Sequence, residues 1–516
     1  MNIFREFEDK IKTCYKIISK QNNYPNDLDL SKCVIELPRD EAHGDLASNI
    51  ALVLAKPLLK NPKEIAELFV TEIEKDESVI SAKIEGPGFI NIILDRSRWG
   101  KEIADILNKG IEYGKNNLGV KQNINIEFVS ANPTGPLHAA HARGAILGDV
   151  LANLMNFSGY NVTREYYIND AGSQIDILSK SAFLRYCESL GEISPNIPEG
   201  LYPGDYLIEV GEHLASKFNN KLKYLTEGEV IEKIGPIAVD IMMTSIKKDL
   251  ARLGVEMDVY SSEQELVNKG KVSFAIKKLQ EDGLIYHGIP EQPKGHLDSD
   301  WEPREQLLFR SKDFGDDMDR PLQKSDNSWT YFASDVAYHY DKLQRTGGKL
   351  IDVLGADHSG YVKRMTAAVQ AMSGKDKMLE VKQCGLVTLL DRGQPVKMSK
   401  RAGTFVTLSD VIDAVGSDVM RFMMLTRRND QPLEFDYAKV TEKSRENPVF
   451  YVQYAHARAR SVLRQNKKPL GRVNLSLLTN IYEIRLIKHL ACWPNYIEAA
   501  VKQYEPHRIA FYLMEL

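Results

Sequence analysis

The most constraining feature of this sequence is the stretch from residue 124 to residue 159, INIEFVSANPTGPLHAAHARGAILGDVLANLMNFSG. Apolar side chains alternate at Ile124, Ile126 and Phe128, which is the two-residue period of a β-strand. A stiff turn with two prolines follows, and apolar residues then recur at helical spacing from Ala142 to Met155. A strand, a tight turn and a buried helix, in that order, form the ligand-binding unit of nucleotide-binding α/β folds.

Two histidines mark the expected start of this helix. His138 and His141 are three residues apart, so both imidazoles can face one ligand in or just before the first helical turn. The open N-terminus of a helix offers unpaired N–H groups and the positive end of a dipole, which suits a phosphate chain. Gly144 and Gly148 are one turn apart and are expected to let the helix lie close to a sheet or ligand. A histidine pair alone is more often structural than catalytic, so a second motif has to decide.

The second motif is VKMSKR, residues 396 to 401, which places three cations on one short loop. It follows a strand-like segment from Cys384 to Leu390 and precedes a helix that Thr407 begins, with Asp410 at capping-box spacing. A lysine-rich loop is usually only a solvated surface. In one chain with a histidine turn, however, it favours a site that binds a nucleoside triphosphate.

The two motifs resemble the HxGH and KMSK signatures of the class I aminoacyl-tRNA synthetases. The flanking segments are similar to the bacterial type of arginyl-tRNA synthetase; they are EFVSANPTGPLHAAHARGAILGD, YYINDAGSQI, YFASDVAYHYDK, VLGADHSGYVKR and VKMSKRAGTFVTL. One residue departs from the family pattern. Ala140 stands where the family often has glycine, and its methyl group narrows the approach of a nucleotide to the backbone.

The resemblance implies roles for individual residues. The catalytic groups would be His138, His141, Lys397 and Lys400. Contacts to ATP would come from His138, Ala139, Ala140, His141, Gly355, Asp357, Lys397, Met398, Ser399 and Lys400. The arginine pocket would be lined by Glu127, Ser130, Ala131, Asn132, His141, Tyr331, Asp335 and His358. Mg²⁺ is expected to arrive with ATP, and no metal site made of protein side chains is predicted.

Asp335 is the best candidate to bind the substrate guanidinium, a flat group of five donors that pairs best with a carboxylate. On a helix it would share a face with Tyr331, four residues earlier. Most aspartates are exposed, so without the resemblance an ordinary surface acid would be the favoured interpretation.

A chain of 516 residues is too long for one core and predicts several domains. Strands and helices alternate around both motifs, which predicts an α/β catalytic domain with a doubly wound, Rossmann-like parallel sheet. The expected parts are an N-terminal α/β domain that binds tRNA (1–115), the catalytic domain (116–380) with a connective insertion at about 165–300, the lysine loop with helices that contact the tRNA stem (381–436), and an α-helical anticodon-binding domain (437–516). That last domain is expected to be incomplete, since the family's version normally continues further.

Charge distribution supports a tRNA partner. The net charge is −4, yet residues 437 to 516 contain 13 Lys and Arg against 6 Asp and Glu. Seven aromatic residues in the same region offer stacking surfaces beside this positive charge; they are Tyr451, Tyr454, Tyr482, Trp493, Tyr496, Tyr504 and Tyr512. A helical bundle with a basic face and an aromatic core is the alternative interpretation.

The five cysteines lack CxxC spacing, and no apolar run reaches the ~18 residues of a membrane span, so a cytoplasmic location is expected. A monomer is expected as well.

The resemblance implies an arginine–tRNA ligase, and two other functions stay open from the sequence. The first is a different nucleotidyltransferase with an HxGH-type turn, whose members are generally much shorter. The second is a tRNA-binding paralogue without catalysis. Loss of the histidines or lysines would mark such a paralogue, and all four are present.

Overall fold

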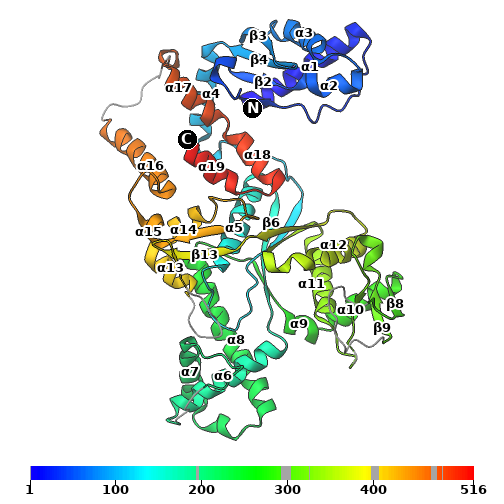
Figure 1. Cartoon of the computed structure of the whole chain (residues 1–516), viewed down its shortest axis with the longest axis vertical. Coiled ribbons are helices and arrows are strands. Elements are labelled where there is room, and N and C mark those ends of the chain that lie inside the picture. The colour runs from blue at the N-terminus through cyan, green and yellow to red at the C-terminus, as the bar shows by residue number, and fades with distance from the viewer. Residues whose placement is uncertain are drawn as a thin grey trace. The chain divides into compact units, whose positions relative to one another are not determined.

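The computed structural model describes residues 2–192, 197–291, 304–324, 326–396, 406–466, 474–478 and 480–516. The chain forms two compact units (Figure 1). The first comprises Met1–Asn116, Ala457–Ala499 and Tyr512–Leu516, and the second comprises Asn117–His456 and Ala500–Phe511. In the described ranges no helix is long and apolar enough to cross a membrane.

The first unit is built on a four-stranded antiparallel sheet of order β1-β2-β4-β3. Its elements are α1 (Ile3–Asn22), β1 (Ile35–Glu36), β2 (Leu46–Ser48), α2 (Ile50–Leu58), α3 (Pro62–Ile73), β3 (Val79–Glu85), β4 (Phe89–Leu94), α4 (Arg96–Lys109) and α17 (Ile481–Ala491). The buried face of α1 carries Phe4, Phe7 and Ile11, at helical spacing. Ile487 and Ala491 of α17 belong to the same core, so residues far apart in the sequence stabilise one unit.

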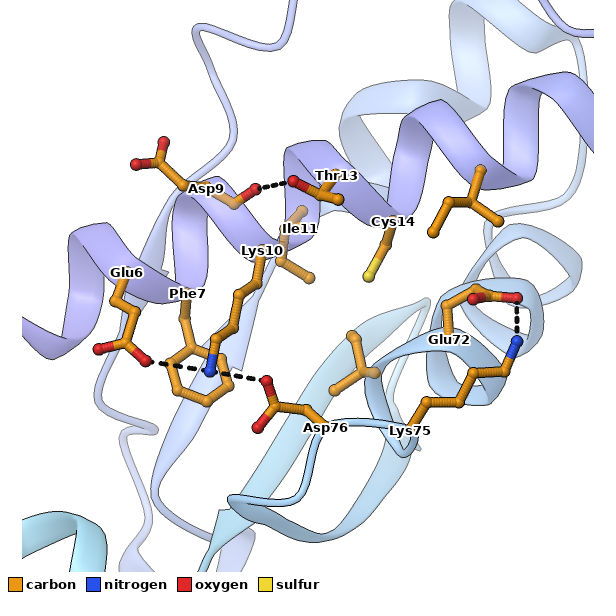
Figure 2. Close-up of a pocket in the computed structure, with 12 residues that line it drawn as sticks. Glu6, Phe7, Asp9, Lys10, Ile11, Thr13, Cys14, Glu72, Lys75 and Asp76 are labelled. Carbon is orange, nitrogen blue, oxygen red and sulfur yellow. Dashed lines mark hydrogen bonds and ion pairs between the residues drawn. The ribbon is translucent and has the colours of Figure 1, made fainter.

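A cavity of about 530 Å³ lies in this unit, between α1 and the end of α3 (Figure 2). Its apolar lining includes Phe7 and Ile73. Lys10 on the rim is paired with the carboxylates of Glu6 and Asp76, at 3.0 and 2.7 Å. The rim lysine is therefore already neutralised by the unit's own acids.

The second unit contains a five-stranded parallel sheet of order β12-β11-β5-β6-β7. Its strands are β5 (Asn123–Glu127), β6 (Asn161–Ile168), β7 (Val259–Ser262), β11 (Lys349–Gly355) and β12 (Leu379–Cys384). Ile126 pairs with Ile351 on one side and with Arg164 on the other. The prediction of a doubly wound α/β fold is confirmed, because the chain runs outward from β5 in both directions.

Helix α5 (His141–Phe157) follows β5 and is buried along most of its length, as predicted. A Cβ atom added to Gly148 would lie 2.2 Å from the ring of Phe128, so this glycine permits the helix to approach the end of the strand. Nothing lies within 4 Å of the position that a Cβ on Gly144 would take, so Gly144 is not needed for packing against the sheet, and its place beside a ligand stays a prediction.

A helical insertion separates β6 from β7. It consists of α6 (Ser173–Ser189), α7 (Ile208–Phe218) and α8 (Glu227–Arg252), with its own core that includes Tyr186, Leu214 and Ile234. After β7 come α9 (Glu263–Asn268) and α10 (Lys271–Glu281). An antiparallel sheet of order β10-β9-β8 follows, made of β8 (Ile285–Gly288), β9 (Gln306–Phe309) and β10 (Arg320–Pro321). Helices α11 (Tyr331–Thr346) and α12 (Ser359–Ser373) complete the sheet's connections.

The segment expected as one strand from Cys384 to Leu390 is divided between two strands. β12 ends at Cys384, and β13 (Val387–Asp391) begins after Gly385 and Leu386 and joins a different sheet with β14 (Gln394–Pro395) and β15 (Leu433–Asp436). A Cβ on Gly385 would lie 2.4 Å from the carbonyl oxygen of Gln431, so the chain turns there against another backbone segment.

The described elements after the lysine motif are mainly helices. They are α13 (Leu408–Val415), α14 (Ser417–Met423), α15 (Tyr437–Thr441), α16 (Pro448–Gln465), α17, α18 (Trp493–Gln503) and α19 (His507–Glu515). The predicted capping box is present at α13, where Thr407 and Asp410 exchange hydrogen bonds. Helices α16, α18 and α19 each contain residues of both units.

Candidate functional site

The predicted site lies where the order of the parallel sheet reverses. β5 and β11 are neighbours, and the connections that follow them run to α5 and α12 on the two sides of this point. In open parallel sheets, ligands bind at the carboxyl ends of the strands beside such a reversal. The residues after Glu127 and after Leu354 are therefore placed to line a site.

The two histidines lie together at the start of α5. Their rings stack with centroids 3.6 Å apart, and the backbone N–H of His138 donates to Nδ1 of His141 at 3.2 Å. Both side chains are partly exposed. Ala140 has φ −65° and ψ −26°, an ordinary conformation for any residue, so alanine fits here without backbone strain. The turn can present two imidazoles and the N-terminus of a 17-residue helix to one anion.

The segment that follows the lysine motif in the sequence, residues 406–408, pairs with the histidine turn. Lys397, Met398, Ser399 and Lys400 themselves lie outside the described residues. Just beyond them, Val406 accepts a backbone hydrogen bond from Ala139 at 3.2 Å, and Leu408 donates one to Leu137 at 2.7 Å. Thr407 and His138 form the antiparallel bridge between these two bonds. The histidine turn and the segment after the lysine motif, about 270 residues apart in the sequence, thus share one short backbone ladder.

A strained corner follows β5. Val129 has φ 70° and Ser130 has φ 38°, in the left-handed region that is rare for residues with side chains, and rarest for a β-branched one. The corner aims the Ser130 hydroxyl at Oε1 of Glu127, 2.9 Å away, while Ser130 Oγ accepts from the N–H of Tyr167 at 3.1 Å. Ala131 accepts from the Tyr166 hydroxyl at 2.7 Å, and Asn132 donates to Gln174 at 2.6 Å.

A buried ion cluster stands behind Glu127. Lys342 of α11 is fully buried, and its Nζ lies 2.6 Å from Glu127 Oε2 and 2.8 Å from Asp352 Oδ1. His339 Nε2 lies 2.8 Å from the other oxygen of Asp352. Burial alone would raise the pKa of Asp352, but Lys342 and His339 hold it well below its usual range. Glu127, His339 and Asp352 have the spacing of a metal site, yet the ammonium of Lys342 is already bonded to both carboxylates.

Asp335 lies one helical turn before His339 and belongs to a group of acidic side chains with Glu263, Glu127 and Asp170. Its carboxylate accepts from the hydroxyl of Tyr361. Burial, together with the nearby charges of Glu263 and Glu127, raises the pKa of Asp335 well above its usual value. The pKa of Glu263 is also raised, by burial and by Asp170. Negative groups crowded in this way are stabilised by a bound cation, which agrees with a pocket for a guanidinium.

The other predicted site residues are more exposed. Tyr331 is the first residue of α11 and is 64% exposed, with Lys324 Nζ 5.6 Å from its ring centre. Gly355 ends β11, and Asp357 and His358 follow it at the surface, where His358 Nε2 lies 3.5 Å from Asp357 Oδ2. They lie at the edge of the sheet expected for a nucleotide. Among the described residues, the Asp335 carboxylate bonds Tyr361 and not Tyr331 or His358.

His339, Lys342, Asp352 and Glu263 were missed in the sequence. His339 and Lys342 share a helical face with Asp335, which was predicted, and Asp352 interrupts the apolar strand KLIDVLG. These charges in expected core positions were a usable signal of a buried cluster. Glu263 carries no such signal, because only the pairing of β7 with β6 brings it near the site.

The sheet, the histidine turn and the returning segment beside it are those of a class I aminoacyl-tRNA synthetase. The family model described as "tRNA synthetases class I (R), catalytic domain" matches residues 102–442. The models for the arginyl-tRNA synthetase N-terminal domain and the DALR anticodon-binding domain match residues 3–94 and 452–516. The chain belongs to the arginyl-tRNA synthetase family, and the resemblance noted in the sequence is confirmed.

Individual relatives agree over the whole length. An arginine–tRNA ligase of Cereibacter sphaeroides is 52% identical, with 100% of this chain and 90% of the relative covered. The corresponding protein of Ruegeria pomeroyi is 50% identical with the same coverage. The solved arginyl-tRNA synthetase of Thermus thermophilus superposes with a TM-score of 0.74 at 19% identity, covering 100% of this chain and 90% of that one, which shows that the fold is shared.

Proposed function

We propose that this chain is an arginine–tRNA ligase, which activates L-arginine with ATP and transfers it to the 3′-terminal ribose of tRNA(Arg). In the first step the carboxylate of arginine attacks the α-phosphate of ATP and pyrophosphate leaves. In the second step a ribose hydroxyl attacks the acyl carbon, and AMP leaves. The observation that carries the proposal is the group of acidic side chains around Asp335, which lies at the same sheet edge as the histidine turn.

Activation needs positioning and positive charge rather than a protein nucleophile. His138 and His141, held beside each other at the start of α5, would donate to the triphosphate. Lys397 and Lys400 would stabilise the leaving pyrophosphate, with Ala139, Ala140, Met398 and Ser399 forming the rest of the nucleotide contacts. Gly355 and Asp357 would line the nucleotide from the end of β11.

We expect Mg²⁺ to enter bound to ATP. Among the described residues, the one carboxylate and histidine cluster with the spacing of a metal site is the cluster that Lys342 bridges, so it does not fit a divalent ion.

Arginine would be held at both ends. Asp335, with Glu263 nearby, pairs with the guanidinium, because a carboxylate accepts two parallel N–H bonds from that group. Glu127 and Ser130 hold the α-amino end, since Glu127 is fixed by Ser130 on one oxygen and by Lys342 on the other. Ala131, Asn132 and His141 complete that end of the pocket, and Tyr331 and His358 would close over the substrate.

The tRNA would contact the basic C-terminal helices, whose family model is an anticodon-binding domain. Several of the aromatic residues counted in the sequence are accessible there; Tyr451, Tyr454 and Tyr482 are 41%, 54% and 76% exposed. The N-terminal domain would provide a second tRNA contact. We place the reaction in the cytoplasm and expect the enzyme to act as a monomer.

Pyrophosphate exchange with ATP tests the proposal directly. Each amino acid is tried in turn, with and without tRNA, and only arginine should support exchange. If none of the amino acids supports exchange, the chain is a non-catalytic paralogue. If a different small substrate is adenylylated, it is another nucleotidyltransferase.

The substitution Asp335→Asn tests the pocket. It keeps the shape but removes the charge, so arginine-dependent kcat/KM should fall at least ~100-fold, given about 1.5–3 kcal/mol per hydrogen bond to a charged group and the added cost of a stranded charge. The KM for ATP should hardly change. The kcat/KM for neutral citrulline should fall much less than that for arginine. Asp341→Asn on the same helix, whose carboxylate pairs with Arg345 at 2.8 Å, is the matched control. Equal losses for arginine and citrulline would contradict this role.

A further inference from the structure

Tyr167 carries a polar group that the protein itself leaves unused. The residue is 8% exposed, and in the described part of the chain its buried hydroxyl has no hydrogen-bond partner. Neighbouring buried tyrosines are different, because Tyr166 donates to Ala131 at 2.7 Å and Tyr338 donates to Glu165 at 3.1 Å. A buried polar group without a partner costs free energy, so its presence calls for an explanation.

The fold holds this residue against the segments that carry Glu127 and Asp335. The N–H of Tyr167 donates to Ser130 Oγ, which itself bonds Glu127. The ring stacks on Tyr338, with centroids 4.2 Å apart and an interplanar angle of 26°. Tyr338 lies three residues after Asp335 on α11, and therefore on the same helical face.

The neighbouring strand brings a further acid near this residue. Tyr167 pairs in register with Ser261 of β7, two residues before Glu263. Burial and the charges of Glu263, Asp335, Glu127 and Asp170 raise the pKa of the Tyr167 hydroxyl, which therefore stays protonated at neutral pH. The hydroxyl is thus a neutral group that interacts electrostatically with several acidic side chains.

We propose that Tyr167 is a specificity-determining residue, whose hydroxyl accepts a hydrogen bond from the guanidinium of bound arginine. This inference rests on the arginine pocket proposed above. A guanidinium has five N–H donors and no acceptor, so two carboxylates leave donors to be satisfied. A tyrosine hydroxyl can accept one such hydrogen bond and can also donate a hydrogen bond to a carboxylate when arginine is bound, which no purely accepting group can do.

The proposal predicts that removing the Tyr167 hydroxyl weakens arginine binding without lowering the stability of the protein. Tyr167→Phe keeps the stacked ring and removes only the hydroxyl, which has no partner in the free protein. The thermal midpoint of the full chain should therefore stay the same or rise. The KM for arginine in pyrophosphate exchange should rise about tenfold or more, the loss expected for one hydrogen bond to a charged group, while the KM for ATP should not change.

Tyr186→Phe is the matched control, because Tyr186 is a fully buried tyrosine of the helical insertion. Its hydroxyl donates to the carbonyl of Asn219 and accepts from the N–H of Leu222 at 3.2 Å. Its removal should lower the thermal midpoint and leave the KM for arginine unchanged, which is the opposite pattern from Tyr167→Phe.

Asp335→Asn distinguishes the two ways in which the proposal can fail. If Tyr167→Phe leaves the KM for arginine unchanged while Asp335→Asn raises it, the pocket stands and the role of Tyr167 is refuted. If neither substitution changes this KM, the pocket itself is misplaced and the inference falls with it. A lowered thermal midpoint for Tyr167→Phe, with equal changes in the KM values for arginine and ATP, would make Tyr167 a structural residue and also overturn the proposal.

Discussion

Replacing Lys342 by methionine should reveal how strongly the site depends on its buried cation. The ammonium is fully buried and bonds two carboxylates whose side chains are 9% and 6% exposed. Removing one partner of a buried ion pair typically costs about 3–5 kcal/mol, because the other charge is left without compensation. Here two carboxylates lose their partner, so we expect the free energy of unfolding to fall by about that amount. Glu127 would also lose the hydrogen bond from Lys342 that orients its carboxylate. The KM for arginine should therefore rise.

Urea unfolding at two pH values measures this effect. In the native protein the pKa of Asp352 lies below its unfolded value, so its contribution to stability is full at neutral pH and is lost progressively as pH falls below the unfolded value. Without Lys342, the pKa of the buried Asp352 carboxyl should rise instead. The stability deficit of Lys342→Met should therefore shrink between about pH 7 and about pH 5, since protonation relieves the buried charges.

The control for this experiment is Lys271→Met. Lys271 pairs with Asp341 of the same helix, but its side chain is 39% exposed, so its loss should cost at most about 1 kcal/mol. The double variant Lys342→Met/Glu127→Gln should recover part of the stability. A deficit as small as that of the control, or one that does not change with pH, would refute the idea that Lys342 neutralises buried carboxylates.

Three further outcomes are expected. Lys400→Ala should slow single-turnover formation of the adenylate by orders of magnitude and leave arginine binding nearly intact, because its charge would act mainly on the leaving pyrophosphate; an unchanged rate would remove this residue from the mechanism. The affinity for tRNA, measured by filter binding, should fall steeply as salt rises, since basic side chains neutralise phosphates; binding that ignores salt would contradict a basic tRNA surface. Gly148→Ala should lower the free energy of unfolding, measured in urea, by about 1–3 kcal/mol, because its Cβ would overlap Phe128. Gly144→Ala, with open space around it, should be neutral or stabilising.

The sequence predicted those parts of the fold that depend on local patterns. The alternation at Ile124, Ile126 and Phe128 placed β5 within one residue of its observed ends, and the helical spacing after it placed α5 within two. The capping box at Thr407 was also correct, because it uses only hydrogen bonds within one turn. Such features are predictable since every interacting residue lies nearby in the chain.

Features that depend on contacts distant in sequence were not predictable in the same way. The division of β12 from β13 at Gly385 arises from the Gln431 backbone, 46 residues later. Likewise, Lys342 could be seen as a charge on a helix, but its partner Glu127 is 215 residues away. Glu263 and Tyr167 approach Asp335 only through the pairing of β6 with β7 and the packing of α11. Pattern and spacing do not encode these approaches, so the group of acidic side chains emerged only from the fold.

If Asp335 and Glu263 hold the guanidinium as proposed, their raised pKa values predict that arginine binding releases protons. In the empty pocket these carboxyl groups, crowded by Glu127 and Asp170, hold protons more tightly than carboxyl groups in water do. A guanidinium favours their ionised forms, so arriving arginine displaces protons to the solvent, and its affinity weakens as pH falls towards those raised values. The heat of binding then depends on the ionisation enthalpy of the buffer. In this way the pocket exchanges protons for its substrate cation.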